Sequence, residues 1–272
     1  MHIVYSPELS ISNEQISLSK PQHVFRTAIH AEDEVLNVEP FKKSEFYLCH
    51  DKKYVDGVFS GTTVNGFGTT SKTYLNQICH TSSAFYKAAL TAYIKTDCGN
   101  IGIVPALVSG FHHAHYDYGR GYCTFNGLVL TAMKMKRLRH LNKIAIIDLD
   151  GHYGDGTEDI INRLQISDWL HNYTHYKNIP RNIGDLIKFL ENFPYINYDL
   201  ILYQAGADAH IDDPYKVGYL DDVAWSIKDN IIFSSVAKYK IPLAFNLAGG
   251  YNGDKTIELH AMTLENARKI NK

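Results

Sequence analysis

Residues 143–157 read KIAIIDLDGHYGDGT, an apolar run that ends abruptly in acidic, histidine and glycine residues. A short continuous apolar run rich in isoleucine is typical of a strand that is buried on both faces of a parallel sheet. Ligands of open α/β sheets bind beyond the carboxyl ends of such strands, because the loops converge there. This segment therefore predicts an α/β fold and places its binding site directly after the strand.

Other segments repeat this pattern along the chain. Similar apolar runs predict strands at His2–Tyr5, Glu45–Cys49, Ala106–Ser109, Lys143–Leu149, Asp199–Gln204 and Pro242–Leu247. Helical spacing of apolar residues predicts helices at Thr81–Lys95, Gly127–Leu141, Ile183–Asn192, Asp221–Lys238 and Thr256–Ile270. Because strands and helices alternate, we expect right-handed crossovers and one mainly parallel β-sheet sandwiched by helices.

The bulk composition restricts the classes of function. The 272 residues contain no linker-like tract and no repeat, so residues 1–272 are expected to form a single domain. The net charge is −2 and the basic residues are scattered, which argues against nucleic acid or an acidic membrane as a partner. The four cysteines lack C-x-x-C spacing, and neither a signal-peptide pattern nor an apolar stretch of roughly 20 residues is present. We therefore expect a cytoplasmic protein, and the oligomeric state stays open.

Metal-capable side chains follow two of the predicted strands. Asp150 and His152 lie two residues apart on an extended segment, which points their side chains the same way. Asp208 follows another apolar run and would be a costly buried carboxylate without a partner. Taken alone, an Asp or His after a strand is more commonly a helix cap or a surface residue. Together, the three supply the ligands that a catalytic zinc commonly takes from a protein.

Several segments, read in order, also resemble a known family. They read SGFHHAHYD (109–117), GYCTFN (121–126), IIDLDGHYGDGT (146–157), AGADAHIDDP (205–214) and LAGGYN (247–252). Their histidine pair, D-x-D-x-H-x-G-D-G segment, G-x-D-x-x-x-x-D-P segment and Gly-Gly-Tyr resemble motifs of the histone deacetylase and acetylpolyamine amidohydrolase family. HDKKYV (50–55) is a weaker match. The resemblance spans most of the chain and implies an arginase/deacetylase-like fold.

The resemblance implies a metal site and a reaction. Asp150, His152 and Asp208 would hold one Zn²⁺, which polarises an amide carbonyl and lowers the pKa of its bound water toward about 7. The implied reaction removes an acetyl or other acyl group from an amine such as a lysine side chain or a polyamine. A structural monovalent cation such as K⁺ is also implied, in contact with Asp148.

The same resemblance implies the catalytic residues. His112 and His113 would form the acid/base pair, with His113 taking a proton from water and returning it to the leaving amine, because imidazole titrates in the right range. Asp148 would orient His112, and Asp155 would orient His113, through the second ring nitrogen. Tyr251 would donate its hydroxyl to the oxygen that gains negative charge.

The substrate contacts are less marked in the sequence. Tyr122 and its neighbour Gly121 match one aromatic wall of the family's substrate tunnel, and Gly250 precedes the tyrosine of the Gly-Gly-Tyr motif. These three residues are predicted to bind the substrate. Glu158–Asn197 replaces the family's longer glycine-rich loop with a shorter, Tyr- and His-rich segment, so the opposite wall is expected to differ.

Two other functions compete with this reading. A binuclear manganese hydrolase resembling arginase would need an additional Asp-Ala-His-x-Asp run. The one run of this form, DAHID (208–212), contains the predicted zinc ligand Asp208, and the sequence shows no further one. A catalytically weak protein that binds acylated ligands would be free to lose its acid/base histidines, whereas both are present here.

Overall fold

A computed structural model describes residues 1–11 and 16–271 and contains one parallel β-sheet. Its strands, in sheet order, are β2 (Glu34–Leu36), β1 (His2–Val4), β3 (Ile103–Ala106), β7 (Leu243–Asn246), β6 (Leu200–Gln204), β4 (Ile144–Asp148) and β5 (Leu170–Thr174). Every pairing between neighbours is parallel. The central strands β3, β7, β6 and β4 are buried at every residue, as their continuous apolar runs predicted.

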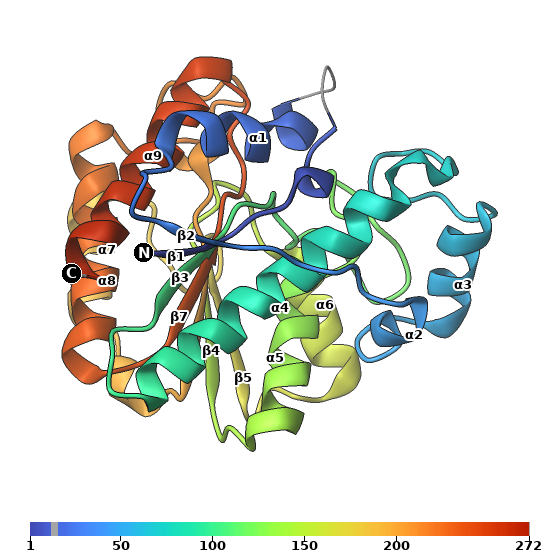
Figure 1. Ribbon diagram of the computed structural model, residues 1–272, viewed down its shortest axis with the longest axis horizontal. Helices are drawn as coiled ribbons and strands as arrows, with labels where there is room; N and C mark the ends of the chain where they lie inside the picture. The colour runs from blue at the N-terminus through green and yellow to red at the C-terminus, as the bar shows by residue number, and fades with distance from the viewer. Residues whose placement is uncertain (12–15, 272) are drawn as a thin grey trace.

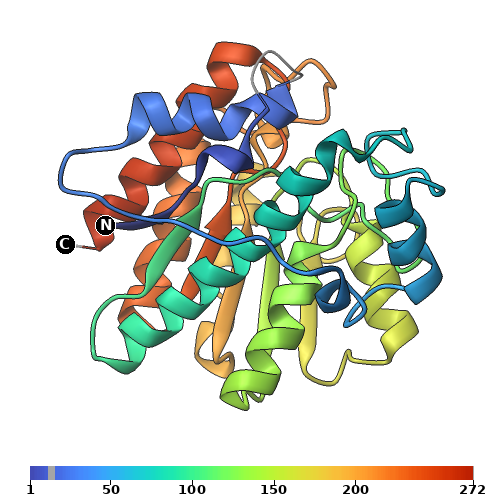
Figure 2. The same cartoon turned by 45° about the vertical axis from the view of Figure 1, so that its right-hand side comes forward.

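Helices cover both faces of the sheet (Figures 1 and 2). One layer holds α1 (Ile16–Ala28), α7 (Ile183–Glu191), α8 (Asp222–Tyr239) and α9 (Gly253–Ile270), and the other holds α4 (Leu75–Asp97), α5 (Gly127–Arg139) and α6 (Asp155–Leu164). The short helices α2 (Lys43–Phe46) and α3 (Lys52–Ser60) lie beside the second layer. The predicted sandwich of helices around a parallel sheet is confirmed.

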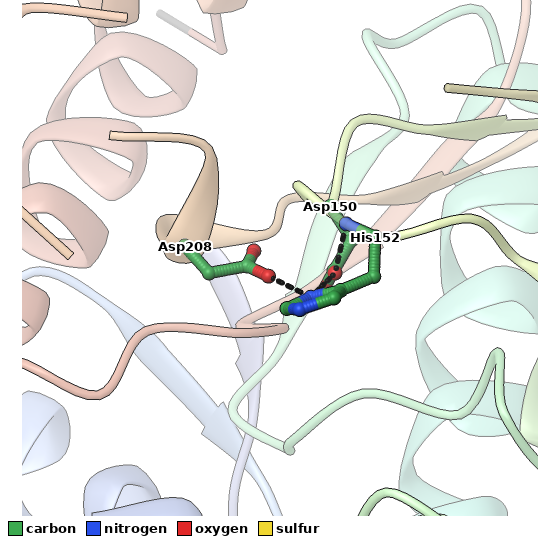
Figure 3. Close-up of side chains that lie close together, drawn as sticks. All are labelled: Asp150, His152 and Asp208. Atoms are coloured by element: carbon green, nitrogen blue, oxygen red, sulfur yellow. Dashed lines mark hydrogen bonds and ion pairs between the residues drawn. The ribbon is translucent and has the colours of Figure 1, made fainter. Parts of the chain in front are cut away.

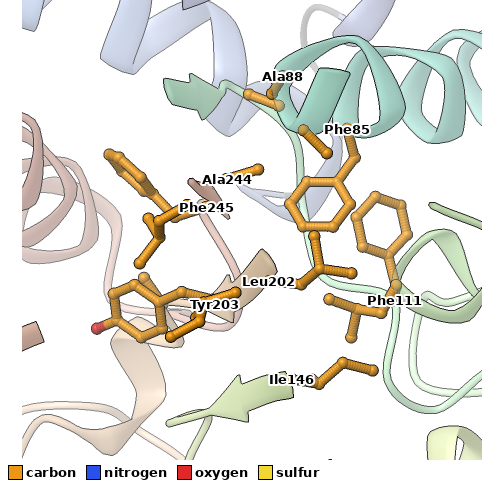
Figure 4. Packing of buried hydrophobic residues seen from close by; sticks show 14 of the residues in the cluster. Phe85, Ala88, Phe111, Ile146, Leu202, Tyr203, Ala244 and Phe245 are labelled. Carbon is orange, nitrogen blue, oxygen red and sulfur yellow. The ribbon is translucent and has the colours of Figure 1, made fainter. Parts of the chain in front are cut away.

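The core fills the two spaces between the sheet and its helix layers (Figure 4). On one face Phe85 of α4 packs on Phe111, with ring centroids 5.4 Å apart. On the other face Phe233 of α8 packs on Phe245 of β7 at 5.3 Å. Because successive strand residues point to opposite faces, a continuous apolar run feeds both halves of the core.

The register of the sheet aligns the strand ends that precede the site. Asp148 pairs with Gln204, Gln204 pairs with Asn246, and Asn246 pairs with Ala106. The segments that follow β3, β4, β6 and β7 therefore leave the sheet at one level and converge at one edge.

Some predicted elements differ from the structure. Residues 45–49 are not a strand: Phe46 and Cys49 are both buried at a spacing of three, which fits the short helix α2 and the turn after it. The strand expected at 106–109 is β3 and ends at Ala106. The strands β2 and β5 were missed because β2 is a short exposed edge and β5 carries alternating polar residues.

One helix begins earlier than the sequence predicted. α4 begins at Leu75, six residues before the predicted start at Thr81. Its first turns carry polar residues that nevertheless are buried, among them Gln77, whose side chain donates to the Leu9 carbonyl at 2.9 Å. Among the described residues, no helix combines the length and apolar character that a bilayer span demands.

Candidate metal centre and active site

The predicted metal ligands lie together at the carboxyl edge of the sheet (Figure 3). Asp150 and His152 follow β4, and Asp208 lies in the short 3-10 helix η4 (Ala207–Ala209) after β6. Their ligand atoms all lie within 4.8 Å of one another. His152 Nδ1 is 2.6 Å from Asp208 Oδ2 and 3.3 Å from Asp150 Oδ1. One imidazole nitrogen and two carboxylates thus face a common point.

Electrostatics of this group favour a cation between the carboxylates. Asp150 and Asp208 are both buried, and burial together with the charge of Asp150 raises the pKa of Asp208 to about 7. Burial opposes ionisation of Asp150 too, but the positive charge of His112 and the bond to His152 lower its pKa. Hydrogen bonds to both carboxylates raise the pKa of His152 to about 10. Two buried carboxylates are costly without positive charge, and this donor set is one that zinc takes in catalytic sites.

Two glycines leave the space in which the carboxylates sit. A Cβ built on Gly249 would meet Asp208 Oδ1, and a Cβ on Gly206 would meet Asp150. Gly249 also has a φ of +51°, in the left-handed region where a side chain is strained. The Asp208 carboxylate is held in addition by the Gly151 N–H, which donates to Oδ1 at 2.9 Å. The residues present therefore fit a divalent ion with His and Asp ligands.

Each histidine of the pair contacts the carboxylate predicted for it. His112 Nδ1 lies 2.8 Å from Asp148 Oδ2, and His113 Nδ1 lies 2.7 Å from Asp155 Oδ1. The two imidazole rings lie side by side with centroids 4.0 Å apart. Because Nδ1 of each ring is engaged, Nε2 is the nitrogen that faces the site, and in His112 it lies 3.4 Å from Asp150 Oδ1.

The two histidines have opposite pKa shifts. Burial lowers the pKa of His112, but the charges of Asp148 and Asp150 outweigh burial and raise it to about 9. Burial and the neighbouring charge of His112 lower the pKa of His113, although Asp155 opposes them. The pair thus combines a protonated ring with a neutral one near pH 7.

Asp148 and Asp155, which contact the two histidines, are held by different interactions. Asp148 is fully buried, and its Oδ1 accepts from the Asp150 N–H at 3.2 Å and from Gln204 Nε2 at 3.4 Å. Asp155 begins α6 and is partly exposed, where the guanidinium of Arg120 contacts its second oxygen. Burial raises the pKa of Asp155, but the bond to His113 outweighs it and the pKa is lowered.

Tyr251 follows β7 through the Gly249–Gly250 turn. Both glycines have left-handed φ, +51° and +84°, a conformation that favours glycine and lets the chain turn sharply before Tyr251. The Tyr251 N–H donates to Asp213 Oδ2 at 2.8 Å, and burial and nearby carboxylates raise the pKa of its hydroxyl. The tyrosine therefore stays protonated and can donate.

A small cavity borders part of this site. Its walls include His112, His113, Gly121, Tyr122, Asp150 and Tyr251, and its volume is about 20 Å³. Gly250 is buried behind this surface, where a Cβ would meet Ala207 and Thr256. Of the predicted substrate contacts, Tyr122 and Gly121 thus border the cavity and Gly250 does not.

Lys20 of α1 also borders the cavity and was missed by the sequence analysis. It is 1% exposed, and its Nζ donates to the Gly249 carbonyl at 2.5 Å. Burial lowers its pKa to about 8, against the charges of Asp150 and Asp208. One feature of the sequence indicates that Lys20 is buried. It lies one helical turn before the buried Val24, on the apolar side of the same helix.

Asp213 was quoted in a motif, but no role followed from the sequence. It is 2% exposed, and its two oxygens accept the N–H groups of Tyr215 at 3.0 Å and Tyr251 at 2.8 Å. Tyr215 was likewise missed, and its ring packs edge to face on Tyr251. The contacts of Asp213 and Tyr215 with Tyr251 could not be predicted from sequence spacing, because the loops after β6 and β7 meet only in the folded chain.

The parallel sheet, with its site at the carboxyl ends of β3, β4, β6 and β7, defines an arginase/deacetylase-like α/β fold. A family model described as histone deacetylase domain matches residues 14–180, and the chain belongs to the histone deacetylase family. The family prediction is thereby confirmed.

Individual relatives agree with this membership. The chain is 25% identical over 190 residues to a protein of Picosynechococcus sp., with 62% of this chain and 63% of that protein covered. It is 25% identical over 250 residues to histone deacetylase 2 of Arabidopsis thaliana, covering 79% and 63%. It is 27% identical over 192 residues to the polyamine deacetylase HDAC10 of Danio rerio, covering 65% and 26%. The matches thus span less than two thirds of these relatives' own lengths.

Proposed function

We propose that this chain is a zinc-dependent hydrolase that removes an acetyl or other acyl group from an amine. The observation that carries the proposal is the convergence of Asp150, His152 and Asp208 within 4.8 Å, beside the His112–His113 pair. Family membership supports a deacetylase-type hydrolase, and names of relatives point to acyl-lysine or acetylated polyamine as the substrate class.

Asp150, His152 and Asp208 would hold the zinc ion. When bound, zinc polarises an amide carbonyl and acidifies water. The described residues contain a single group of this kind, which favours one ion over the binuclear alternative. The monovalent cation such as K⁺ near Asp148 stays a prediction.

The remaining steps are assigned to side chains of this chain. His113, neutral because burial and His112 lower its pKa, accepts a proton from the attacking water at Nε2. Its Nδ1 stays hydrogen-bonded to Asp155, which fixes the ring and stabilises the positive charge it gains. His113 then protonates the leaving amine, while the charged His112 stabilises negative charge nearby.

Tyr251 would complete the arrangement by donating its hydroxyl to the oxygen that becomes negative. Its backbone is set by Asp213 and by the left-handed glycines before it. Tyr122 and Gly121 would border the acyl group, and Gly250 would act through the turn. We further propose that residues 1–272 act as one domain, and that its free cysteines suit the cytoplasm.

A substrate panel tests this function. Acetylated lysine peptides and acetylated polyamines are incubated with the protein, with chelator, and with chelator followed by added zinc. We expect hydrolysis that chelator abolishes and zinc restores. If the zinc-loaded protein binds these amides but hydrolyses none of them, the alternative of an acyl-ligand binding protein replaces the proposal.

A further inference from the structure

The carboxylate of Asp155 contacts a guanidinium as well as the imidazole of His113. Its Oδ1 accepts the Gly156 N–H at 2.9 Å and lies 2.7 Å from His113 Nδ1. Its Oδ2 accepts a hydrogen bond from Arg120 Nη2. The imidazole of His115 is also near, with Nε2 3.5 Å from Oδ2, but it makes no hydrogen bond there. Arg120 is therefore the cation that binds the oxygen that His113 does not use.

A tight turn brings Arg120 to this position. The Cys123 N–H donates to the Arg120 carbonyl at 2.9 Å. Between them, Gly121 and Tyr122 have left-handed φ of +54° and +63°, and two consecutive residues of this kind are typical of a type I′ turn. A Cβ on Gly121 would lie 2.7 Å from His113 Cδ2, so the turn packs directly on the ring. The turn that supports the His113 ring thus also carries the Arg120 side chain.

The ion pair between Arg120 and Asp155 contributes little to folding. The Arg120 side chain is 55% exposed and that of Asp155 is 21% exposed, and water screens charges at such positions. The pair of Arg163 and Asp159 is similar, with side chains 46% and 23% exposed, but its carboxylate approaches His115 and not the predicted acid/base pair. The feature that distinguishes Arg120 is therefore the identity of its partner.

A fixed carboxylate matters to His113 because the bond to Asp155 orients the ring. The last torsion of an Asp side chain is soft, so its carboxylate turns easily unless both oxygens are held. Here Arg120 holds Oδ2 while the Gly156 N–H holds Oδ1. Burial raises the pKa of Asp155, but the bond to His113 and the charges of His113 and Arg120 outweigh burial and lower it. Asp155 therefore stays ionised and keeps accepting from Nδ1.

We infer that Arg120 is a positioning residue for the acid/base work of His113, a role that rests on the proposed function. Through Asp155, the guanidinium keeps the His113 ring aligned with the water that gives up a proton and with the amine that receives one. Arg120 is not among the residues that line the cavity, so it acts on turnover and not on substrate binding.

Variant kinetics separate this role from a structural one. Arg120→Lys keeps the positive charge and Arg120→Ala removes it. Arg163→Ala is the matched control, since it removes an arginine of similar exposure from a similar ion pair. Each zinc-loaded protein is assayed for kcat and KM on the acetylated amine of the panel above that the wild type hydrolyses fastest. The assays are repeated with guanidinium chloride at about 20 mM, too dilute to unfold a domain, and with sodium chloride at the same concentration.

We expect Arg120→Ala to lower kcat about 10- to 100-fold while KM changes less than about threefold. Arg120→Lys should lose less, because an ammonium can still bind the Asp155 carboxylate. Guanidinium, but not sodium, should raise the kcat of Arg120→Ala several-fold by taking the vacated place beside Asp155. Arg163→Ala should keep the wild-type kcat and should not respond to guanidinium. Zinc content equal to that of the wild type shows that the variants are intact.

Two results would overturn the role of Arg120 and leave the proposed function standing. One is a kcat of zinc-loaded Arg120→Ala within about threefold of the wild type or equal to that of Arg163→Ala. The other is a loss that neither lysine nor guanidinium relieves, which indicates a structural defect. A zinc-loaded wild type that hydrolyses no member of the panel overturns the proposed function, and the role of Arg120 with it.

Discussion

Asp213 holds the backbone of Tyr251: its buried Oδ2 accepts the Tyr251 N–H at 2.8 Å across 38 residues of sequence. The other oxygen accepts the N–H of Tyr215 at 3.0 Å. One carboxylate thus connects the loop after β6, which supplies Asp208, with the loop after β7, which supplies Tyr251.

Replacing Asp213 with Asn should reduce turnover about 10- to 100-fold. Asn has one acceptor oxygen, so it can accept only one of the two backbone N–H groups, and its NH2 group then faces the other N–H. Zinc content should stay at the wild-type level, since Asp213 is not among the predicted ligands. Steady-state kinetics and metal analysis measure the two effects. The neighbouring exposed Asp212 provides the control, and Asp212→Asn should be unchanged. Equal losses in both variants would show that Asp213 has no special role.

Tyr251→Phe should lower kcat by about 100- to 1,000-fold, the usual cost of one lost hydrogen bond to a developing oxyanion. KM and zinc content should change little, because the ring and its backbone contact to Asp213 are kept. Turnover of an acetylated amine under saturating conditions is the measurement, with Tyr239→Phe as control. A kcat within about threefold of the wild type would remove Tyr251 from the catalytic residues.

Gly249→Ala should weaken zinc binding by about 10- to 100-fold, a loss typical of disturbed support around metal ligands. The new methyl group would meet Asp208 Oδ1, and φ at this position is +51°. Gly253→Ala is the matched control, since a Cβ there meets nothing within 4 Å. Competition with a chromophoric chelator gives both affinities, and no substrate is needed. Equal zinc affinity in the two variants would contradict this packing argument.

The ion pair between Asp33 and Arg268 should stabilise the fold far from the site. Arg268 donates to both oxygens of the fully buried Asp33 carboxylate, at 3.2 and 2.7 Å, and the His30 N–H donates at 2.9 Å. Asp33→Asn should lower the free energy of unfolding by about 3 kcal/mol at pH 7, because the buried guanidinium of Arg268 then keeps only the part-exposed Glu265 as its counter-charge.

The pH dependence of that loss has a definite sign. Burial raises the pKa of Asp33, but the bonds to Arg268 and His30 outweigh it and lower the pKa. A lowered folded-state pKa adds stability that is present above the unfolded value of about 4 and disappears as the pH falls through the folded value. Urea unfolding at pH 7 and pH 3.5 should show the gap between wild type and variant shrinking. The exposed Asp168→Asn is the control, and a gap that grows on acidification would contradict the assignment.

The sequence predicted the parts of the fold that local pattern controls. The run before Asp148 is buried on both faces and is strand β4, and the polar residues after it do reach the site edge. Local pattern failed at the edge strand Leu170–Thr174, where polar and apolar residues alternate, and at residues 45–49, where a short apolar run is helical. Short runs of this kind fit either period, so tertiary packing decides between them.

The site was predictable where residues are close in sequence or belong to a motif. Asp150, His152, Asp208 and the two His–Asp pairs lie together as expected, although their roles stay predictions. Lys20 and Tyr215 were not predictable, because each reaches the site through the packing of a helix or loop that has no motif of its own.

The metal content of the purified protein decides whether Asp150, His152 and Asp208 bind zinc. After dialysis against zinc and removal of the excess, mass spectrometry of the digested samples counts ions per chain for the wild type and Asp208→Ala. We predict one zinc per wild-type chain and far less than one in the variant. Two ions per wild-type chain, none at all, or an undiminished ion in Asp208→Ala would contradict it.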